Sequence, residues 1–190
     1  SRTMDYGAPY VDDRYPSSIA NELDQLTYLG YDLRFGAVDQ ATDPDGNLTT
    51  AEYDPFGRVV RVVAQDGTET QLAYERCGVV ACTAVSGAVA AVKITTTVFN
   101  GIQVAPERVR YLDVLGREVL TEVEALDGTD GWRRQRKVFN NRGLVQYASK
   151  PYFSTQTTPT CSGASSNCTW FTYDVRDRVT RVDRPDLGFT

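Results

Sequence analysis

Carboxylates are the side chains of this sequence with the clearest potential for catalysis. The chain has no histidine, so it lacks the commonest general base and metal ligand, and no Ser-His-Asp or Cys-His site can form within it. Asp12-Asp13 and Glu122-x-Glu124 are the paired carboxylates, and Glu122 and Glu124 share one face of an extended strand. Nothing else marks a pocket, and acidic residues are common on solvated strand faces. We therefore predict that the chain is not an enzyme.

The nearest approach to a metal site is a possible calcium loop, Asp43-x-Asp45-x-Asn47. The calcium pattern requires glycine at the sixth position, where this sequence has Leu48, and Pro44 does not suit it. Turn formation explains these residues better. We predict no metal and no cofactor.

The four cysteines fall in two local pairs, Cys77-x4-Cys82 and Cys161-x6-Cys168. Zinc sites usually have shorter spacings, often with histidine. We expect two local disulfides, with free thiols as the alternative. Disulfides would indicate an oxidising compartment.

Residues 132–137, WRRQRK, form the only basic run. This run could bind an acidic partner, or stack an arginine on Trp132. Its alternation of polar side chains also suits an edge strand that resists aggregation, which is the interpretation we favour. If the chain is a binding module, Trp132 and Trp170 are the aromatic candidates for its surface.

The overall composition limits the range of partners. The chain has 190 residues, enough for one domain with a sizeable core, and a net charge of -5. An acidic balance argues against nucleic acid and against anionic membranes. The longest weakly polar stretch, residues 87–92, is too short to span a membrane. The first residues lack a signal-peptide layout, so we expect any export signal to lie outside this chain.

The elements that must position these residues are strands in a repeat. Tyr10, Tyr31, Tyr53 and Tyr74 begin similar segments at spacings of 21, 22 and 21 residues, and a fixed period of this size indicates a repeat architecture. Further units begin near residues 111, 138 and 173. Insertions at about residues 77–97 and 154–169 interrupt the period, contain the cysteine pairs, and are predicted to be loops.

Each unit is predicted to be a strand, an Asp-Gly turn, a second strand and a Tyr-Asp turn. Asp-Gly between alternating segments favours a two-residue type I′ hairpin turn. In the Tyr-Asp turn, glycine suits the left-handed position after a type I turn, and the aspartate can bond the amides ahead of it. Only residues 18–29 show helical spacing, and we favour strands there with a turn at Asn21. The residues expected to hold the repeat are Tyr31, Asp32, Gly36, Asp45, Gly46, Tyr53, Asp54, Gly57, Arg58, Asp66, Gly67, Tyr111, Asp113, Gly116, Arg117, Asp127, Gly128, Gly143, Tyr173 and Asp174.

The predicted fold is therefore all-β, an antiparallel meander of hairpins running through residues 1–190 as a single segment. The motif Tyr-Asp-x-x-Gly-Arg, accompanied by Asp-(Pro)-x-Gly, resembles the YD repeat of Rhs proteins. Residues 43–47, 53–58, 111–117 and 173–178 carry the resemblance, which extends from about Tyr10 to Gly188. The sequence departs from the motif at Leu112, which is inserted, at Asp177, which replaces glycine, and at Phe139-Asn140, which replaces Tyr-Asp.

The resemblance implies a curved, spiralling sheet that forms part of a larger β-shell. Bacterial Rhs toxins and the related insecticidal toxin complexes enclose a C-terminal toxin in such a shell, and teneurins use a similar barrel in adhesion. It thus implies a secreted or cell-surface bacterial protein whose partners are the remaining shell and an enclosed toxin domain.

The alternative is a module that binds carbohydrate or a cell-surface protein through the sheet or the cysteine-tipped loops. The last residues, RVDRPDLGFT, resemble AVDQATDPDGNLTT within a unit, so we expect a piece of a longer array. An open sheet edge on such a piece would tend to pair with another chain.

Overall fold

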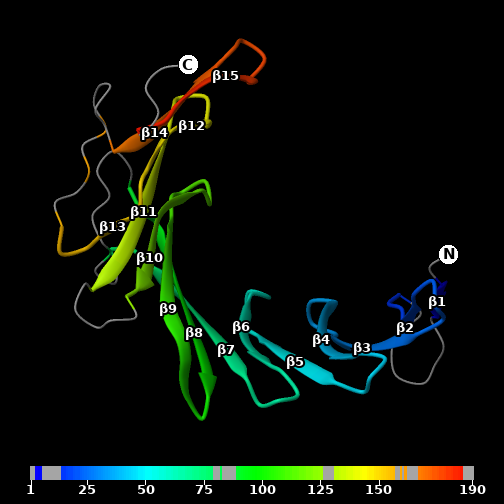
Figure 1. The fold of residues 1–190 in the computed structure, drawn as a ribbon. Coiled ribbons are helices and arrows are strands. Elements are labelled where there is room, and N and C mark those ends of the chain that lie inside the picture. Colours follow the sequence, from blue (N-terminus) through cyan, green and yellow to red (C-terminus); the bar gives the residue numbers. More distant parts are fainter. Residues whose placement is uncertain are drawn as a thin grey trace. The chain divides into compact units, whose positions relative to one another are not determined.

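The structure is a computed structural model that describes residues 3–5, 14–78, 82, 89–125, 131–156, 159, 161 and 167–185. This part of the chain consists of strands and turns (Figure 1), and it contains no helix able to cross a membrane. The strands are β1 (Thr3–Asp5), β2 (Ser18–Ala20), β3 (Leu26–Asp32), β4 (Ala37–Thr42), β5 (Leu48–Tyr53), β6 (Val59–Val63), β7 (Glu69–Arg76), β8 (Val92–Asn100), β9 (Ile102–Leu112), β10 (Glu118–Glu124), β11 (Trp132–Phe139), β12 (Val145–Ser149), β13 (Tyr152–Phe153), β14 (Cys168–Tyr173) and β15 (Val179–Asp183).

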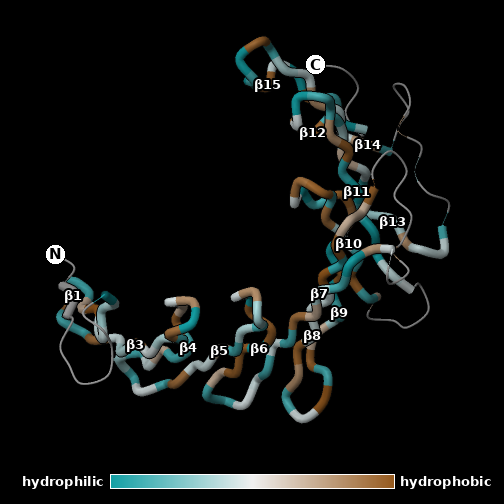
Figure 2. Tube along the Cα trace, turned by 180° about the vertical axis from the view of Figure 1, so that it is seen from behind, coloured by the Kyte–Doolittle hydropathy of each residue, from teal (hydrophilic) through white to brown (hydrophobic). Residues whose placement is uncertain are grey.

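The strands follow one another through the sheet in chain order, except that β13 pairs with β11 to the side of the main path. Every pair with a described register is antiparallel. The predicted all-β antiparallel meander is therefore confirmed. Apolar residues recur in short patches along it rather than in long runs (Figure 2), as expected for strands whose side chains alternate between faces.

The chain divides into two compact units, Ser1–Leu72 with Thr97–Ala105, and Ala73–Thr96 with Pro106–Thr190. Among the described residues of the first unit, only Ser18 and Ala20 are buried. The second unit has a hydrophobic cluster of Val109, Tyr111, Val119 and Leu120, against which Cys77, Cys82, Ala90, Trp132 and Phe139 pack. Among the described residues, the second unit therefore has a hydrophobic core and the first has almost none.

The structure corrects the predicted Asp-Gly turns. Asp45 and Asp66 are not among the described residues with positive φ, whereas Gly46 and Gly67 have φ of +85° and +80°. A type I′ turn needs positive φ at both central positions, so these are not type I′ turns. The Gly67 N–H donates to the Ala64 carbonyl at 3.0 Å, which gives a type I turn followed by one left-handed glycine.

Other differences concern boundaries and edges. Strand β8 begins at Val92 and β14 at Cys168, so both loop insertions end before the predicted residues 97 and 169. The β8–β9 hairpin turns at Gly101, where the repeat pattern predicts no turn. Strand β11 pairs with β10 on one side and with β12 and β13 on the other. The prediction that the basic run is an edge strand is therefore wrong.

Candidate functional site

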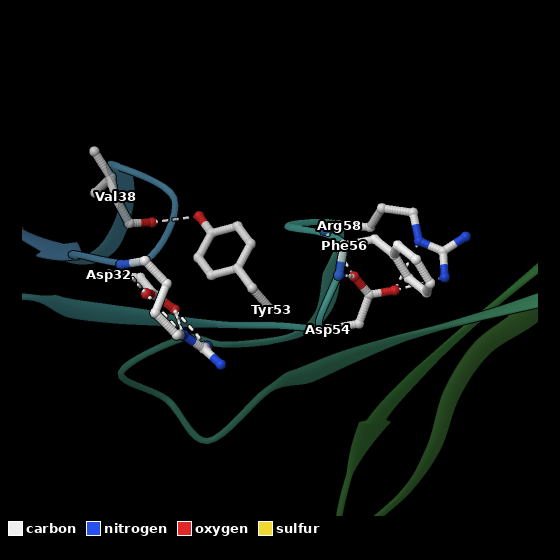
Figure 3. Close-up of polar contacts among 7 residues, drawn as sticks. Asp32, Val38, Tyr53, Asp54, Phe56 and Arg58 are labelled. Atoms are coloured by element: carbon white, nitrogen blue, oxygen red, sulfur yellow. Dashed lines mark hydrogen bonds and ion pairs between the residues drawn. The ribbon is translucent and has the colours of Figure 1, made fainter.

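One carboxylate organises each Tyr-Asp turn, and Asp54 shows how. Its Oδ1 accepts the backbone N–H of Phe56 at 2.9 Å and of Arg58 at 3.0 Å. Its Oδ2 accepts Nε of Arg58 at 2.7 Å and pairs with Nη2 at 2.6 Å (Figure 3). The Gly57 N–H donates to the Asp54 carbonyl at 3.0 Å, and Gly57 has a φ of +75°. This is the predicted type I turn with a left-handed fourth residue.

The same contacts recur at Asp113 and Asp174. Each Oδ1 accepts two backbone N–H groups at 2.8 to 3.0 Å, and each Oδ2 accepts Nε of the arginine four residues later at 2.7 Å. In the last turn Asp177 takes the left-handed position with a φ of +62°, which aspartate tolerates better than most residues. The replacement of glycine there therefore leaves the turn intact.

Three turns that depart from the motif show which of its contacts is always present. Asn140 Oδ1 accepts the N–H groups of Arg142 and Leu144 at 3.0 and 3.1 Å without an arginine at the fifth position. Asp43 bonds the side chain of Asn47 in place of an arginine, at 2.8 Å. The Asp32 turn is one residue longer and its carboxylate pairs with Arg34 at 2.6 Å. The common element is the side-chain oxygen of the first residue.

These hydrogen bonds keep the turn carboxylates ionised. The backbone N–H and then the guanidinium of Arg178 hold the pKa of Asp174 below its ordinary value. For Asp113 burial acts to raise the pKa, but hydrogen bonds from Arg117 outweigh it, so the pKa is lowered as well. An ionised Asp113 that is 8% exposed therefore has its charge fully satisfied by its own turn.

The tyrosine hydroxyls connect neighbouring repeats. Tyr31 donates to the Pro16 carbonyl at 3.0 Å, Tyr53 to Val38 at 2.5 Å, and Tyr173 to Val145 at 2.9 Å (Figure 3 draws the second). Val38 and Val145 each lie two residues after the turn glycine of the preceding repeat. The hydroxyl thus fixes the distance between one repeat and the one before it.

Aromatic rings also cover the turn glycines of the next repeat. A Cβ at Gly57 would lie 3.0 Å from Cδ1 of Phe35, and a Cβ at Gly36 would meet the hydroxyl of Tyr15. The ring pairs are Tyr15 with Tyr31, 5.0 Å between centroids, and Phe35 with Tyr53, 6.4 Å. The repeat pattern does not predict the roles of Tyr15 and Phe35, although Phe35 stands directly before the turn glycine Gly36.

The inserted Leu112 moves Tyr111 into the core of the second unit. There Tyr111 donates to Oε2 of Glu122 at 2.8 Å, and Arg134 donates from Nε to Oε1 at 2.6 Å. Glu122 is buried, whereas Glu124 is exposed and accepts the Glu107 N–H at 3.1 Å. The paired carboxylates considered for acid–base work are therefore both engaged in structural contacts.

The other singled-out residues have these positions. Disulfides join Cys77 to Cys82 and Cys161 to Cys168. Trp132 packs against the hydrophobic cluster, and Trp170 lies 4.7 Å from the ring of Tyr147 on β12. The residues outside the described part of the chain include Tyr10, Asp12, Asp13, Asp127 and Gly128.

An open concavity of about 380 Å³ lies over β9, β10 and β11 in the second unit. Arg108, Arg133, Arg134, Lys137 and Glu118 are among its lining residues. Lys137 pairs with Glu118 at 3.1 Å and Arg134 with Glu122, while Arg108 and Arg133 are exposed and form no ion pair with described residues. The concavity is therefore positively charged in a chain whose net charge is negative.

Comparisons with known proteins bear on the fold. No family model matches the chain, and no curated protein matches it. A crystal structure of TcdB2-TccC3 is similar with a TM-score of 0.57 and 16% identity, over 88% of this chain and 11% of that one. A crystal structure of TcdB2-TccC3-TEV has a TM-score of 0.47 and 13% identity, over 95% of this chain and 15% of that one. The first match shows a shared fold, and the chain spans about a ninth of that structure's length.

Proposed function

We propose that this chain is a wall segment of a larger YD-repeat shell that encloses a toxin domain, and that it has no catalytic activity of its own. The observation that carries the proposal is the contact between repeats: the hydroxyls of Tyr31, Tyr53 and Tyr173 reach the preceding repeat, and aromatic rings cover the turns at Gly36 and Gly57. Such contacts stabilise an array rather than a pocket. The shared fold with part of TcdB2-TccC3 is in keeping with this role.

The sparse burial in the first unit supports the same proposal. A sheet needs a second layer to cover its apolar side chains, yet Tyr28, Leu26 and Leu48 are all at least 40% exposed. A shell wall would be covered by neighbouring repeats or by its contents. The two disulfides suit a secreted or cell-surface bacterial protein.

Electron cryo-microscopy of the protein isolated from its natural source tests this function. We expect a hollow β-shell in which this sequence fits part of the wall and separate density lies inside. A free protein of the size of this chain, or a solid assembly without internal density, would contradict the proposal.

A second candidate is a binding module, and the cationic concavity favours it. Arg108 and Arg133 form no ion pair with described residues, and guanidinium groups match carboxylates and sulfates. No aromatic side chain is among the described residues that line the concavity, so an anionic sugar would be recognised by charge rather than by stacking. We propose a polyanionic saccharide as the ligand in this case.

Calorimetric titration with a sulfated or uronic oligosaccharide tests the second candidate. We expect binding that weakens with salt and falls at least about tenfold in Arg108→Ala and Arg133→Ala, which is the scale of one charged hydrogen bond. Arg176→Ala, at an exposed turn, is the matched control. No heat of binding, or equal loss in the control, would remove this candidate.

A further inference from the structure

Arg136 is a buried cation without an acidic partner among the residues that the structure describes. It extends from β11, its exposure is 5%, and its Nε is buried with no hydrogen-bond partner. Its Nη2 donates to the Pro159 carbonyl at 2.7 Å and contacts Sγ of Cys161 at 3.2 Å. The ring of Tyr147 lies 5.8 Å from the guanidinium carbon. None of these groups carries a negative charge.

No described carboxylate forms an ion pair or hydrogen bond with Arg136. Residues 131–173 contain six Lys and Arg and no Asp or Glu. On the facing strand β10, Glu118 pairs with Lys137 and Glu122 with Arg134. A buried charge without a counter-ion is costly. Of the groups that touch Arg136, the sulfur of Cys161 is one that can become anionic, because reduction of the disulfide converts it to a thiolate.

We propose that Cys161–Cys168 is a redox-responsive bridge, and that Arg136 favours its reduced form by holding the Cys161 thiolate. A nearby cation stabilises a thiolate over the thiol, which raises the reduction potential of the bridge and improves that sulfur as a leaving group. The proposal does not rest on the shell role.

The reductant is a dithiol, and the reaction balances as ordinary thiol–disulfide exchange. Cys161 is half-buried while Cys168 is 1% exposed, so a thiolate of the dithiol attacks Sγ of Cys161. The S–S bond breaks, and Cys168 leaves as a thiolate and takes up a proton. The second thiol of the dithiol then attacks the mixed disulfide and releases Cys161 as a thiolate beside Arg136. The dithiol becomes a disulfide.

The Cys77–Cys82 disulfide is an internal reference for the reduction of Cys161–Cys168. The sulfurs of Cys77 and Cys82 accept no hydrogen bond from a described Lys or Arg, and both residues pack against the hydrophobic cluster. The Cys77 N–H donates to the Ala91 carbonyl at 2.9 Å. Burial in apolar surroundings disfavours a thiolate, so the reduction potential of Cys77–Cys82 is lower than that of Cys161–Cys168.

The test equilibrates the chain in buffers of reduced and oxidised dithiothreitol, quenches with acid, alkylates, and quantifies each cysteine by peptide mass spectrometry. We expect Cys161–Cys168 to be half reduced at a reduced-to-oxidised ratio at least about tenfold lower than Cys77–Cys82, or about 30 mV. Coincident midpoints, or the reverse order, would overturn the proposal in the unmodified chain.

Substitutions test whether Arg136 causes the difference between the reduction midpoints of the two disulfides. In Arg136→Met the Cys161–Cys168 midpoint should move about tenfold towards reducing conditions, while Cys77–Cys82 stays in place. Arg133→Met, on the opposite face of β11, should move neither. If Arg136→Met does not fold, Arg136→Lys retains a charge and should keep the order of the two bridges.

A second readout separates a charge effect from a packing effect. In the reduced chain, alkylation of Cys161 should reach half its maximal rate at a lower pH than alkylation of Cys77, and this difference should vanish in Arg136→Met. An unchanged pH profile in the variant would show that Arg136 does not hold the thiolate.

Discussion

At the scale of single residues, the side-chain oxygen of the first turn residue decides the local structure. Asp54, Asp113, Asp174 and Asn140 all present Oδ1 to the backbone N–H groups two and four residues later. Asn140 shows that the negative charge is not required for this. The charge matters for a separate interaction, the pairing of Oδ2 with an arginine.

Substitutions at Asp113 can separate these two contributions. Asp113→Asn keeps both backbone bonds, as Asn140 does, and should lower the free energy of unfolding by about 1 kcal/mol at pH 7 through the lost pairing with Arg117. Asp113→Ala should cost about 1 kcal/mol more, because two N–H groups lose their acceptor. Urea unfolding monitored by circular dichroism measures both. Equal losses in the two variants would contradict this assignment.

The acid dependence of stability follows from the lowered pKa of Asp113. A carboxyl whose pKa is lower in the folded state stabilises the fold above its ordinary value of 3.8, and this contribution is lost as the pH falls through the folded-state value. Asparagine does not titrate. The difference in stability between the wild type and Asp113→Asn should therefore shrink as urea unfolding is repeated from pH 5 to pH 3. A constant difference would show that the pKa of Asp113 is the same in the folded and the unfolded state.

At the scale of elements, the repeat depends on contacts between consecutive hairpins. Gly57 and Gly67 both have a φ near +80°, but a Cβ at Gly57 would crowd Phe35 whereas one at Gly67 would meet nothing within 4 Å. A substitution at Gly67 therefore measures only the free-energy cost of a side chain in left-handed backbone. A substitution at Gly57 adds the free-energy cost of moving the contact with the neighbouring repeat.

We expect Gly67→Ala to destabilise the chain by about 1 kcal/mol, the cost of a left-handed alanine. Gly57→Ala should cost about 1 kcal/mol more, because Phe35 must move. A double-mutant cycle with Phe35→Ala, measured by urea unfolding, should remove the excess. An excess that persists without the Phe35 ring would mean that the ring does not cover this turn.

The same elements show what the sequence could predict. Period and turn residues were sufficient for the meander and for the Tyr-Asp turns, because both depend on contacts within about five residues. The Asp-Gly turns were predicted as type I′ because Asp45-Gly46 and Asp66-Gly67 do not reveal that the preceding residues lengthen the turn. Contacts between repeats, such as Phe35 on Gly57, depend on tertiary packing, which no local pattern encodes. The basic run lies inside the sheet because β11 pairs with β10 and β12 along the main path. The two-residue strand β13, which has no sequence signal, pairs with the rest of that edge.

At the scale of the whole molecule, the two units differ in their source of stability. The second unit has a buried cluster and two disulfides. The described residues of the first unit bury Ser18 and Ala20 and otherwise depend on turns and repeat contacts. Local opening is easiest where few apolar contacts hold the backbone. The isolated chain should therefore open unit by unit rather than in one step.

Native-state hydrogen exchange followed by mass spectrometry tests this difference. We expect the amides of β10 and β11 to exchange at least about 100-fold more slowly than those of β5 and β6, since opening free energies range from near zero up to the global value. Repeating the measurement after reduction and alkylation separates the contribution of the disulfides from that of the cluster of Val109, Val119 and Leu120. Protection that is uniform across β5, β6, β10 and β11 would mean that the first unit is as cooperative as the second, and that repeat contacts alone can substitute for a core.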